Sequence, residues 1–376
     1  MKLRRFARSS SVFVCLSIAG PVFAATIVVD NDFLDCPQAD FNSIQLAVNA
    51  AQPGDKILVC PGLYVENPPP APAAVLITKS DLRIEAQGAP GEVVLQGTPA
   101  QEHGFQVLNT TGVLLQGFTV QDFGTHANIE IQGGRGNTLR KNITKGGVEG
   151  GIHVFNSSAN VVEQNTSFNN RNGIFVGGNT PNPAEPASDN IIRHNETYGN
   201  RANGIAIIFS GPRNVVFGNR SYDNALSGVL NAALSHENVI ENNHVFANDQ
   251  AGIQIANSTA VTARNNRSES NTSGIRLANG AANNLVEKNE IFKNTENGVL
   301  LQINVDANTV QLNLVRSNGR DGIRIFDAAS NGNRIERNVM RENVEHDAHD
   351  DGTANVWINN KCETEDQPGL CKNPDH

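Results

Sequence analysis

The residues best suited to chemistry in this 376-residue chain lie near its C-terminus, in the stretch HDAHDDG. Asp347, Asp350 and Asp351 offer hard oxygen ligands of the kind that calcium prefers, whereas His346 and His349 would suit a transition metal better. An imidazole such as that of His349 can also accept a proton during catalysis. A polar loop that simply ends the fold is the third interpretation, and the residue types leave all three open.

This stretch interrupts a repeat that can be followed through two columns of asparagine. The first column is Asn142, Asn165, Asn195, Asn219, Asn243, Asn266, Asn289, Asn313 and Asn338, and the second, five residues later, is Asn170, Asn200, Asn224, Asn248, Asn271, Asn294, Asn318 and Asn343, with Gly147 as its one exception. Steps along the first column are 23, 30, 24, 24, 23, 23, 24 and 25 residues. A period in the twenties indicates a solenoid. We expect the amides to form ladders between coils and to occupy left-handed bends.

Each repeat also carries a glycine followed by alternating apolar residues, as in GIHV, GIFV, GIAI, GIQI, GIRL and GIRI. Alternation predicts a short strand with one buried face. Two further short strands fit into a unit of about 23 residues, which leaves no room for a helix in each repeat. Strands of successive coils would pair in parallel, about 4.8 Å apart. The sequence therefore predicts an all-β solenoid.

The layout resembles the right-handed parallel β-helix of the pectate-lyase-like superfamily over nearly the whole chain. The opening agrees with this resemblance, because FNSIQLAVNAAQPGD places Ile44, Ala47, Val48 and Ala51 on one helical face. In secreted β-helix proteins such a helix covers the open end of the first coil. The resemblance implies a fold that hosts lyases, hydrolases, epimerases, adhesins and accessory proteins, so the site has to decide the function.

Four segments are predicted along the chain. A signal peptide occupies 1–24, the N-terminal cap and first coils 25–103, the β-helix repeats 104–345, and a C-terminal cap 346–376. In the last segment Trp357 is expected to pack over the final coil.

The first residues read as a secretory signal, with four basic residues before the apolar run VFVCLSIAG and small residues up to Ala24, where cleavage is expected. The protein should then be secreted or periplasmic, and no later run is long enough to cross a membrane. Loss of four positive charges takes the formal charge from −9 to −9 − 4 = −13, which excludes nucleic acid as a partner. We expect a monomer.

Four cysteines remain after the signal, in two close pairs: Cys36 with Cys60, and Cys362 with Cys371. In an oxidising compartment these pairs predict two disulfides. A metal-thiolate site is the competing interpretation, but the pairs lie at opposite ends of the chain.

In the enzymes that this fold resembles, substrate lies along the outside of the sheet built from the GIxV strands. The outward column of that sheet includes His153, Phe175, Arg276, Arg324 and, at its end, His349. The two arginines are two coils apart, about 10 Å, which is the spacing of alternate charges on an extended polyuronide. We therefore predict that the first four bind substrate, with solvated strand residues as the competing interpretation.

The string DAHD stands where the next GIxV strand is due, which would place His349 beside Arg324 and point Asp350 into the core. A buried carboxylate needs a partner such as a cation, so Asp347, Asp350 and Asp351 are the predicted metal ligands, with calcium as the candidate ion. DAHD is also similar to the DPHD motif of alginate C5-epimerases, with Ala348 in place of the proline. That resemblance implies His349 as a proton acceptor and Arg324 as the group that neutralises a uronate carboxylate.

Two departures from the repeat could form the walls of a binding groove: the Pro-rich segment 67–74 and about seven extra residues after the GIFV strand. Tolerated surface insertions are the alternative.

The sequence leaves two candidate functions. One is an exported protein that binds, and cleaves or epimerises, an acidic polysaccharide or cell-envelope glycan; the other is a non-catalytic surface module or metal-processing accessory factor. The polygalacturonase strings N-T-D, G-H-G and R-I-K are missing, which disfavours hydrolysis by paired carboxylates.

Overall fold

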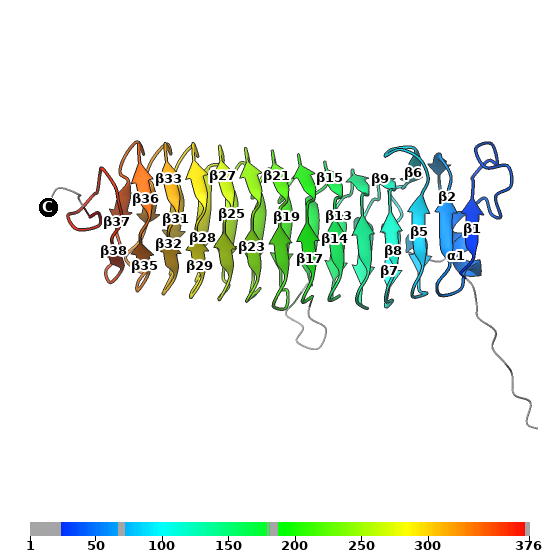
Figure 1. Cartoon of the computed structure of the whole chain (residues 1–376), viewed down its shortest axis with the longest axis horizontal. Coiled ribbons are helices and arrows are strands. Elements are labelled where there is room, and N and C mark those ends of the chain that lie inside the picture. Colours follow the sequence, from blue (N-terminus) through cyan, green and yellow to red (C-terminus); the bar gives the residue numbers. More distant parts are fainter. Residues whose placement is uncertain (1–23, 67–71, 179, 181–186, 373–376) are drawn as a thin grey trace, which may run out of the picture.

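The computed structural model describes residues 24–66, 72–178, 180 and 187–372, and these form a long solenoid of short strands (Figure 1). The chain makes about 12 turns of ~24 residues, and each regular turn contributes one strand to each of three parallel sheets. The predicted all-β right-handed parallel β-helix with three strands per coil is thus confirmed. The predicted signal peptide falls almost wholly on residues 1–23, which lie outside the described residues.

The first sheet contains fourteen strands, which succeed one another along the solenoid axis. They are β1 (Thr26–Val29), β2 (Lys56–Val59), β5 (Arg83–Ala86), β8 (Leu114–Gln116), β11 (Thr138–Arg140), β14 (Val161–Glu163), β17 (Ile191–Arg193), β20 (Val215–Phe217), β23 (Val239–Glu241), β26 (Thr262–Arg264), β29 (Leu285–Glu287), β32 (Thr309–Gln311), β35 (Arg334–Glu336) and β38 (Val356–Ile358).

The second sheet contains twelve strands, most of them three residues long. They are β3 (Gly62–Tyr64), β6 (Val93–Gln96), β9 (Thr119–Gln121), β12 (Ile143–Lys145), β15 (Thr166–Phe168), β18 (Glu196–Tyr198), β21 (Arg220–Tyr222), β24 (His244–Phe246), β27 (Arg267–Glu269), β30 (Glu290–Phe292), β33 (Leu314–Arg316) and β36 (Val339–Arg341).

The third sheet, also of twelve strands, is built from the GIxV segments and carries the candidate site. Its strands are β4 (Ala73–Ile77), β7 (His103–Leu108), β10 (Ala127–Gln132), β13 (Gly150–Phe155), β16 (Asn172–Gly177), β19 (Ile205–Ile208), β22 (Val229–Ala232), β25 (Ala251–Ala256), β28 (Ser273–Ala278), β31 (Val299–Gln302), β34 (Ile323–Ile325) and β37 (Ala348–Asp350).

The core runs through the middle of the solenoid and is filled by the inward residue of each strand. In β13, for example, Ile152 and Val154 are fully buried, and so is Leu139 of β11 in another sheet, which belongs to the same core. Burial of such a side chain contributes roughly 1.5–3 kcal/mol. Because side chains alternate, the residues between them, such as His153, must point outward from the sheet.

The asparagine columns form ladders inside the corners between the sheets, as predicted. The backbone N–H and the side-chain amide of Asn219 both donate to Oδ1 of Asn243 in the next coil, at 2.9 and 3.0 Å, and the same amide donates to the carbonyl of Ile192. A third ladder, which was not predicted, runs through Asn137 and Asn160 and resumes further along the chain. Each net hydrogen bond contributes about 1 kcal/mol, so a ladder stabilises the corner of each coil through which it runs.

The predicted conformation of these asparagines was wrong. Asn142 and Asn165 do not have positive φ; the residue before each of them does, with φ of 53° at Lys141 and 57° at Gln164. A side chain in the left-handed region costs roughly 1–2 kcal/mol. The two or three hydrogen bonds made by the following amide offset that cost, so the bend needs the asparagine as a buried partner.

The N-terminal end is covered by α1 (Ile44–Ala50), which begins at the N-cap Ser43, whose hydroxyl accepts from the backbone N–H of Leu46. The predicted apolar face of this helix is buried in the first coils, and Ile44 and Ala47 are fully inaccessible (Figure 1). Without this cover the first strands would expose apolar ends and pairing edges.

The C-terminal end is covered by the last strand and the tail. Trp357 in β38 pairs with Ile335 of the previous coil and packs against the core, as expected. Cys362 and Cys371 form one disulfide, which also packs against the core, and Cys36 and Cys60 form the other, so both predicted pairs are confirmed. Disulfides are the mark of an exported protein.

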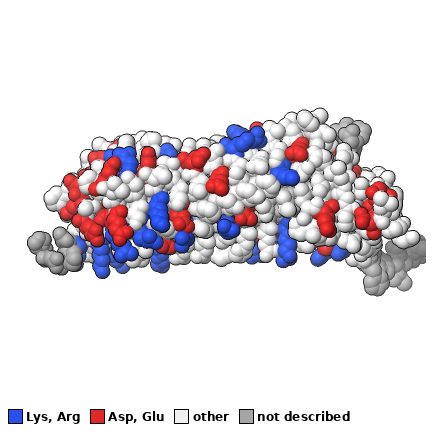
Figure 2. Space-filling view, turned by 90° about the horizontal axis from the view of Figure 1, so that it is seen from above, with Lys and Arg blue, Asp and Glu red and all other residues white. Residues whose placement is uncertain are grey.

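Within the described residues no helix has the length and apolar content that a membrane crossing requires. Figure 2 shows acidic and basic side chains mixed on one face of the solenoid, with the acidic ones denser toward the C-terminal end. The charge is therefore spread rather than gathered into one basic strip on that face.

Candidate functional site

The outward column of the third sheet has the register that the repeat predicted. Neighbouring strands align the column residues Gln106, Glu130, His153, Phe175, Ala206, Leu230, Gln254, Arg276, Leu300, Arg324 and His349 one to one. Residues that lie 22 to 31 positions apart in the sequence thus form one row along the axis, because parallel coils stack without offset.

A groove lies over the first part of this row. It encloses a cavity of about 730 Å³, lined among others by His103, Glu130, His153 and Phe175. The strands β7, β10, β13 and β16 supply these four residues, and Pro72 marks one wall. Two of the predicted substrate-binding residues therefore meet in one cavity.

The insertions predicted to wall the groove fall partly outside the described residues, namely at 67–71, 179 and 181–186. The described residue Pro72 follows one of them. The second insertion begins after Gly177, the last residue of β16. The same strand carries Phe175, which lines the cavity. Their role as walls stays a prediction.

Glu130 is the central carboxylate of the groove and is only 5% exposed. Its Oε1 accepts a hydrogen bond from the amide of Gln106 at 3.3 Å and lies 3.5 Å from Nε2 of His103. Its Oε2 lies 4.0 Å from Nδ1 of His153. Burial raises the pKa of Glu130 above its ordinary value, although the hydrogen bond from Gln106 opposes this.

The two buried imidazoles beside it are neutral over the physiological range. Burial lowers the pKa of His103 to about 4 and that of His153 to about 3, with further lowering from neighbouring histidines. Neither His103 Nδ1 nor His153 Nε2 has a hydrogen-bond partner of good geometry. The ring of His153 packs against Phe175, with centroids 5.1 Å apart. Such polar atoms are costly to leave unpaired in a buried position.

The position of His153 depends on a glycine. A Cβ atom on Gly150 would lie 2.2 Å from Nε2 of His153, so a side chain there would displace the ring. The glycine is part of the sequence GGIHV, and it is needed here for space.

The groove has little positive charge of its own. Its described lining contains the carboxylates Glu102, Glu130 and Glu149, and the one guanidinium Arg171, which is ion-paired with Glu149. An acidic ligand therefore needs another source of positive charge in this cavity.

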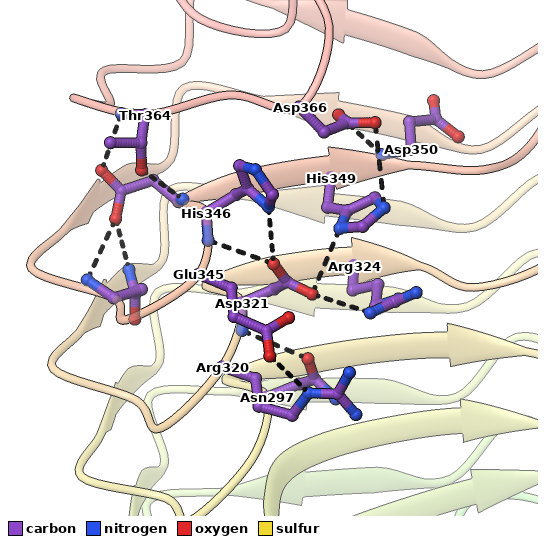
Figure 3. A network of polar contacts seen from close by, with 12 residues as sticks. Asn297, Arg320, Asp321, Arg324, Glu345, His346, His349, Asp350, Thr364 and Asp366 are labelled. Atoms are coloured by element: carbon purple, nitrogen blue, oxygen red, sulfur yellow. Dashed lines mark hydrogen bonds and ion pairs between the residues drawn. The ribbon is translucent and has the colours of Figure 1, made fainter.

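A second cluster, drawn in Figure 3, lies at the C-terminal end of the same sheet and centres on Asp321, which is fully buried. Arg324 Nη1 lies 3.1 Å from Oδ2 of Asp321, His346 Nδ1 lies 3.3 Å from Oδ1, and His349 Nδ1 lies 3.3 Å from Oδ2. The backbone N–H of His346 donates to Oδ1 as well. Both oxygens of this carboxylate thus face protein groups.

The predicted catalytic pair is adjacent, as the register required, but is enclosed by this cluster. The side chain of His349 is 15% exposed, and its Nε2 lies 3.4 Å from Asp351 and 3.8 Å from Asp366 of the tail. Arg324 also pairs with Asp351 at 3.2 Å and lies over the ring of Phe326. Their catalytic role stays a prediction, and the large cavity lies elsewhere.

The predicted cation ligands Asp347 and Asp350 already have protein partners. Asp347 accepts from the amide of Asn343 at 2.6 Å and from the backbone of Glu363 at 2.8 Å, so it closes an asparagine ladder. Asp350 points inward as expected, and it accepts hydrogen bonds from the indole N–H of Trp357 at 2.7 Å and from the amide of Asn355 at 3.0 Å.

The structure does not gather Asp347, Asp350 and Asp351 into one ligand group. Among the described residues, the groups of three donors within 4.8 Å of one another are His103 with His126 and Glu130, and Asp321 with His346 and His349. Calcium at the three aspartates stays a prediction.

Arg276, the remaining predicted substrate ligand, is half-buried on β28. Burial lowers its pKa, and Glu296 nearby opposes this effect. With its amide oriented to suit both groups, Gln302 accepts from Nη2 and Nε of Arg276 at 2.8 and 3.0 Å. The guanidinium is thereby held on the outer face of the sheet.

Sequence reasoning missed His103, His126 and Asp321. The spacing of His103 and His126, 23 residues, equals the coil period and was the available signal. Both histidines lie at the start of a strand or just before one, outside the outward column. For that reason the column alone could not reveal them.

Comparison with known proteins places the chain among β-helix proteins. Residues 94–235 match the model of the right-handed β-helix region, and 184–302 and 235–367 match that of the periplasmic copper-binding protein NosD. No curated protein matches the chain in sequence.

Solved structures with the same fold include alginate-modifying enzymes. The Azotobacter vinelandii mannuronan C-5 epimerase AlgE6 A-module is 16% identical, with a TM-score of 0.68 over 88% of this chain and 95% of the other. The AlgE4 A-module of the same organism is 16% identical, with a TM-score of 0.66 over 86% and 93%. The periplasmic alginate epimerase AlgG is 17% identical, with a TM-score of 0.52 over 76% of each chain. These matches, together with the three parallel sheets, identify the chain as a right-handed parallel β-helix repeat protein.

Proposed function

We propose that this exported β-helix protein binds an acidic polysaccharide in the groove over β7, β10, β13 and β16, with the sugar chain parallel to the solenoid axis. The observation that carries the proposal is the cavity of about 730 Å³ lined by imidazoles, a buried carboxylate and Phe175. Amides and carboxylates suit the hydrogen-bonding pattern of sugar hydroxyls, and an aromatic ring provides an apolar platform. Structural relatives that bear the names of alginate epimerases support the substrate class.

The preference for an acidic polymer rests on the rest of the column. Arg276 stands five coils from His153, roughly 24 Å along the axis, a distance that an extended oligosaccharide spans. Its guanidinium is held on the outer face by Gln302. Arg324, two coils further on, is already paired with Asp321 and Asp351, so Arg276 is the guanidinium that we assign to the polymer. The polymer would therefore meet the imidazoles at one end and the guanidinium of Arg276 at the other.

The finer step of the proposal is proton transfer beside the uronate carboxylate, as in a lyase or C5-epimerase. His153 is the candidate proton acceptor because it lines the cavity as a neutral imidazole. Its low pKa makes it a weak base in the empty groove. A uronate carboxylate bound beside it would raise that pKa and so strengthen the base. His349 with Arg324 is the alternative catalytic pair.

The test is incubation of the mature protein with alginate, pectate and other uronates, with and without calcium. Binding is followed by calorimetry, cleavage by the absorbance of unsaturated products, and C5 configuration by NMR. We expect binding that His153→Ala weakens and His349→Ala leaves unchanged. Loss in the second variant alone would move the site to the C-terminal cluster. Absence of binding by every uronate with the fold intact would reject the proposal.

The second candidate is a non-catalytic accessory role in metal handling, favoured by the match of residues 184–302 and 235–367 to the NosD model. Within the matched and described residues, the group of possible ligands is Asp321, His346 and His349. This function predicts copper binding that is lost in His346→Ala, with no affinity for uronates.

A further inference from the structure

We propose that His103, His126 and Glu130 form a binding site for a divalent transition-metal ion. The role we give this ion rests on the proposed function, but its binding can be measured without any sugar. One ligand atom from each of the three residues lies within 4.8 Å of the other two. Donor atoms bound at about 2.0–2.2 Å to one ion lie roughly 3–4 Å apart, so the site closes with a shift of about 1 Å. His126 is exposed and can make that shift.

Among the described residues, the two buried members of the site have each other and Gln106 as polar partners, and neither is paired with a lysine or an arginine. His103 is 3% exposed, and its Nδ1 has no hydrogen-bond partner of good geometry. Its Nε2 lies 3.5 Å from the carboxylate of Glu130, which is itself buried. A cation between an imidazole and a buried carboxylate would repay the desolvation of both groups.

The donor set selects the kind of ion. Two imidazoles and one carboxylate suit zinc, copper or nickel, whereas calcium and magnesium prefer a shell of oxygen atoms. Three protein ligands leave at least one coordination position free, and this position would open into the cavity of about 730 Å³. Through this free position the ion could also coordinate a ligand bound in the groove.

The second group of three donors, at the C-terminal end, is less suited to a divalent cation. Asp321, His346 and His349 satisfy the same spacing, but the guanidinium of Arg324 already lies 3.1 Å from Oδ2 of Asp321. A divalent cation there would be repelled by this fixed charge at short distance. Among the described residues that line the groove, the one guanidinium is that of Arg171, which is paired with Glu149 instead.

The ion would supply positive charge, which the groove lacks. Among the described lining residues, Arg171 is the one guanidinium, so the carboxylates dominate. A divalent ion at Glu130 would stand next to His153, whose Nδ1 lies 4.0 Å from that carboxylate. Its charge would attract a uronate carboxylate to the imidazole that we propose as the proton acceptor.

The experiment titrates the chelator-treated mature protein with Co²⁺, followed by visible absorption, and with Zn²⁺, followed by calorimetry. We expect one equivalent to bind to the unmodified protein and affinity to fall roughly tenfold or more in His126→Ala. His346→Ala is the matched control, since it removes an imidazole from the other three-donor group. Far-ultraviolet circular dichroism shows that both variants are folded.

Saturable binding that is lost in His126→Ala and kept in His346→Ala supports the site. No saturable binding by the unmodified protein, or unchanged affinity in His126→Ala, overturns it, as does loss confined to His346→Ala. The proposed function fails separately: zinc bound through His126 by a protein that binds no uronate keeps the metal site and rejects the polysaccharide.

Discussion

Two clusters of histidine and acid lie on the same face of the same sheet, one over β7 to β13 and the other at β34 and β37, and their electrostatics differ. In the groove, the buried carboxylate of Glu130 has a raised pKa, and His103 and His153 have lowered ones. At the C-terminal end, Asp321 is surrounded by Arg324 and two imidazoles. The C-terminal cluster finds its charge complement within the chain and contacts the tail through Asp366. We propose that the groove cluster receives its complement from a ligand.

The largest test of this contrast replaces each central acid by its amide. Asp321→Asn leaves Arg324 without its buried counter-charge, and we expect a loss of about 3 kcal/mol in the free energy of unfolding. Glu130→Gln removes a charge that burial disfavours, so the stability should stay the same or rise slightly. Urea unfolding of both variants measures the difference. Equal losses would show that both acids are structural.

The second prediction concerns the Cys362–Cys371 disulfide, whose loop contacts the C-terminal cluster. Asp366, which faces His349, lies in the loop between Cys362 and Cys371. Replacing Cys362 by Ser should cost about 2–3 kcal/mol through the entropy of the unfolded chain. Thermal unfolding should show a lower midpoint, with the solenoid intact by circular dichroism at low temperature. An unchanged midpoint would mean that the tail contributes nothing to the cap.

The two ends of the site could be predicted from the sequence to different degrees. The outward column was predictable because the repeat fixes the register, and an error in one coil is corrected by its neighbours. The partner of Asp350 was not predictable, because Trp357 reaches it from the following coil. His103 and His126 were missed because their convergence depends on how the corner before each strand turns.

The ladders illustrate the same limit at a smaller scale. The columns of Asn142 and Asn170 predicted the hydrogen bonds between coils, because amides repeated at the coil period have no other arrangement that pairs them all. The left-handed backbone was assigned one residue too late, since it belongs to residues such as Lys141. Residue type alone could not reveal this, because lysine is not typical of that conformation.

The groove should also respond to pH. The pKa of His153 is about 3 in the folded protein against 6.5 in the unfolded chain. Because the folded-state pKa is the lower one, the unfolded chain binds more protons between these values, so stability is complete above pH 6.5 and falls below it. At about 1.4 kcal/mol for each pH unit, the loss reaches ~2 kcal/mol at pH 5.

Urea unfolding at pH 7.5 and pH 5 measures this effect. We expect His153→Gln to reduce the difference between the two pH values, and the exposed His194→Gln to leave it as in the unmodified protein. Equal pH dependence in all three proteins would show that the burial of His153 is relieved before it is protonated.

The smallest effect concerns ligand contact and asks whether the difference between the clusters is functional. Phe175 supports the ring of His153 and lines the cavity, so Phe175→Ala should weaken uronate binding about tenfold, or ~1.4 kcal/mol, through loss of an aromatic contact. Phe326→Ala is the matched control, because that ring lies under Arg324 in the closed cluster. Its affinity should not change. If Phe326→Ala weakened binding as much as Phe175→Ala, the C-terminal cluster would have to open for the polymer, and its ion pairs would be a gate rather than a cap.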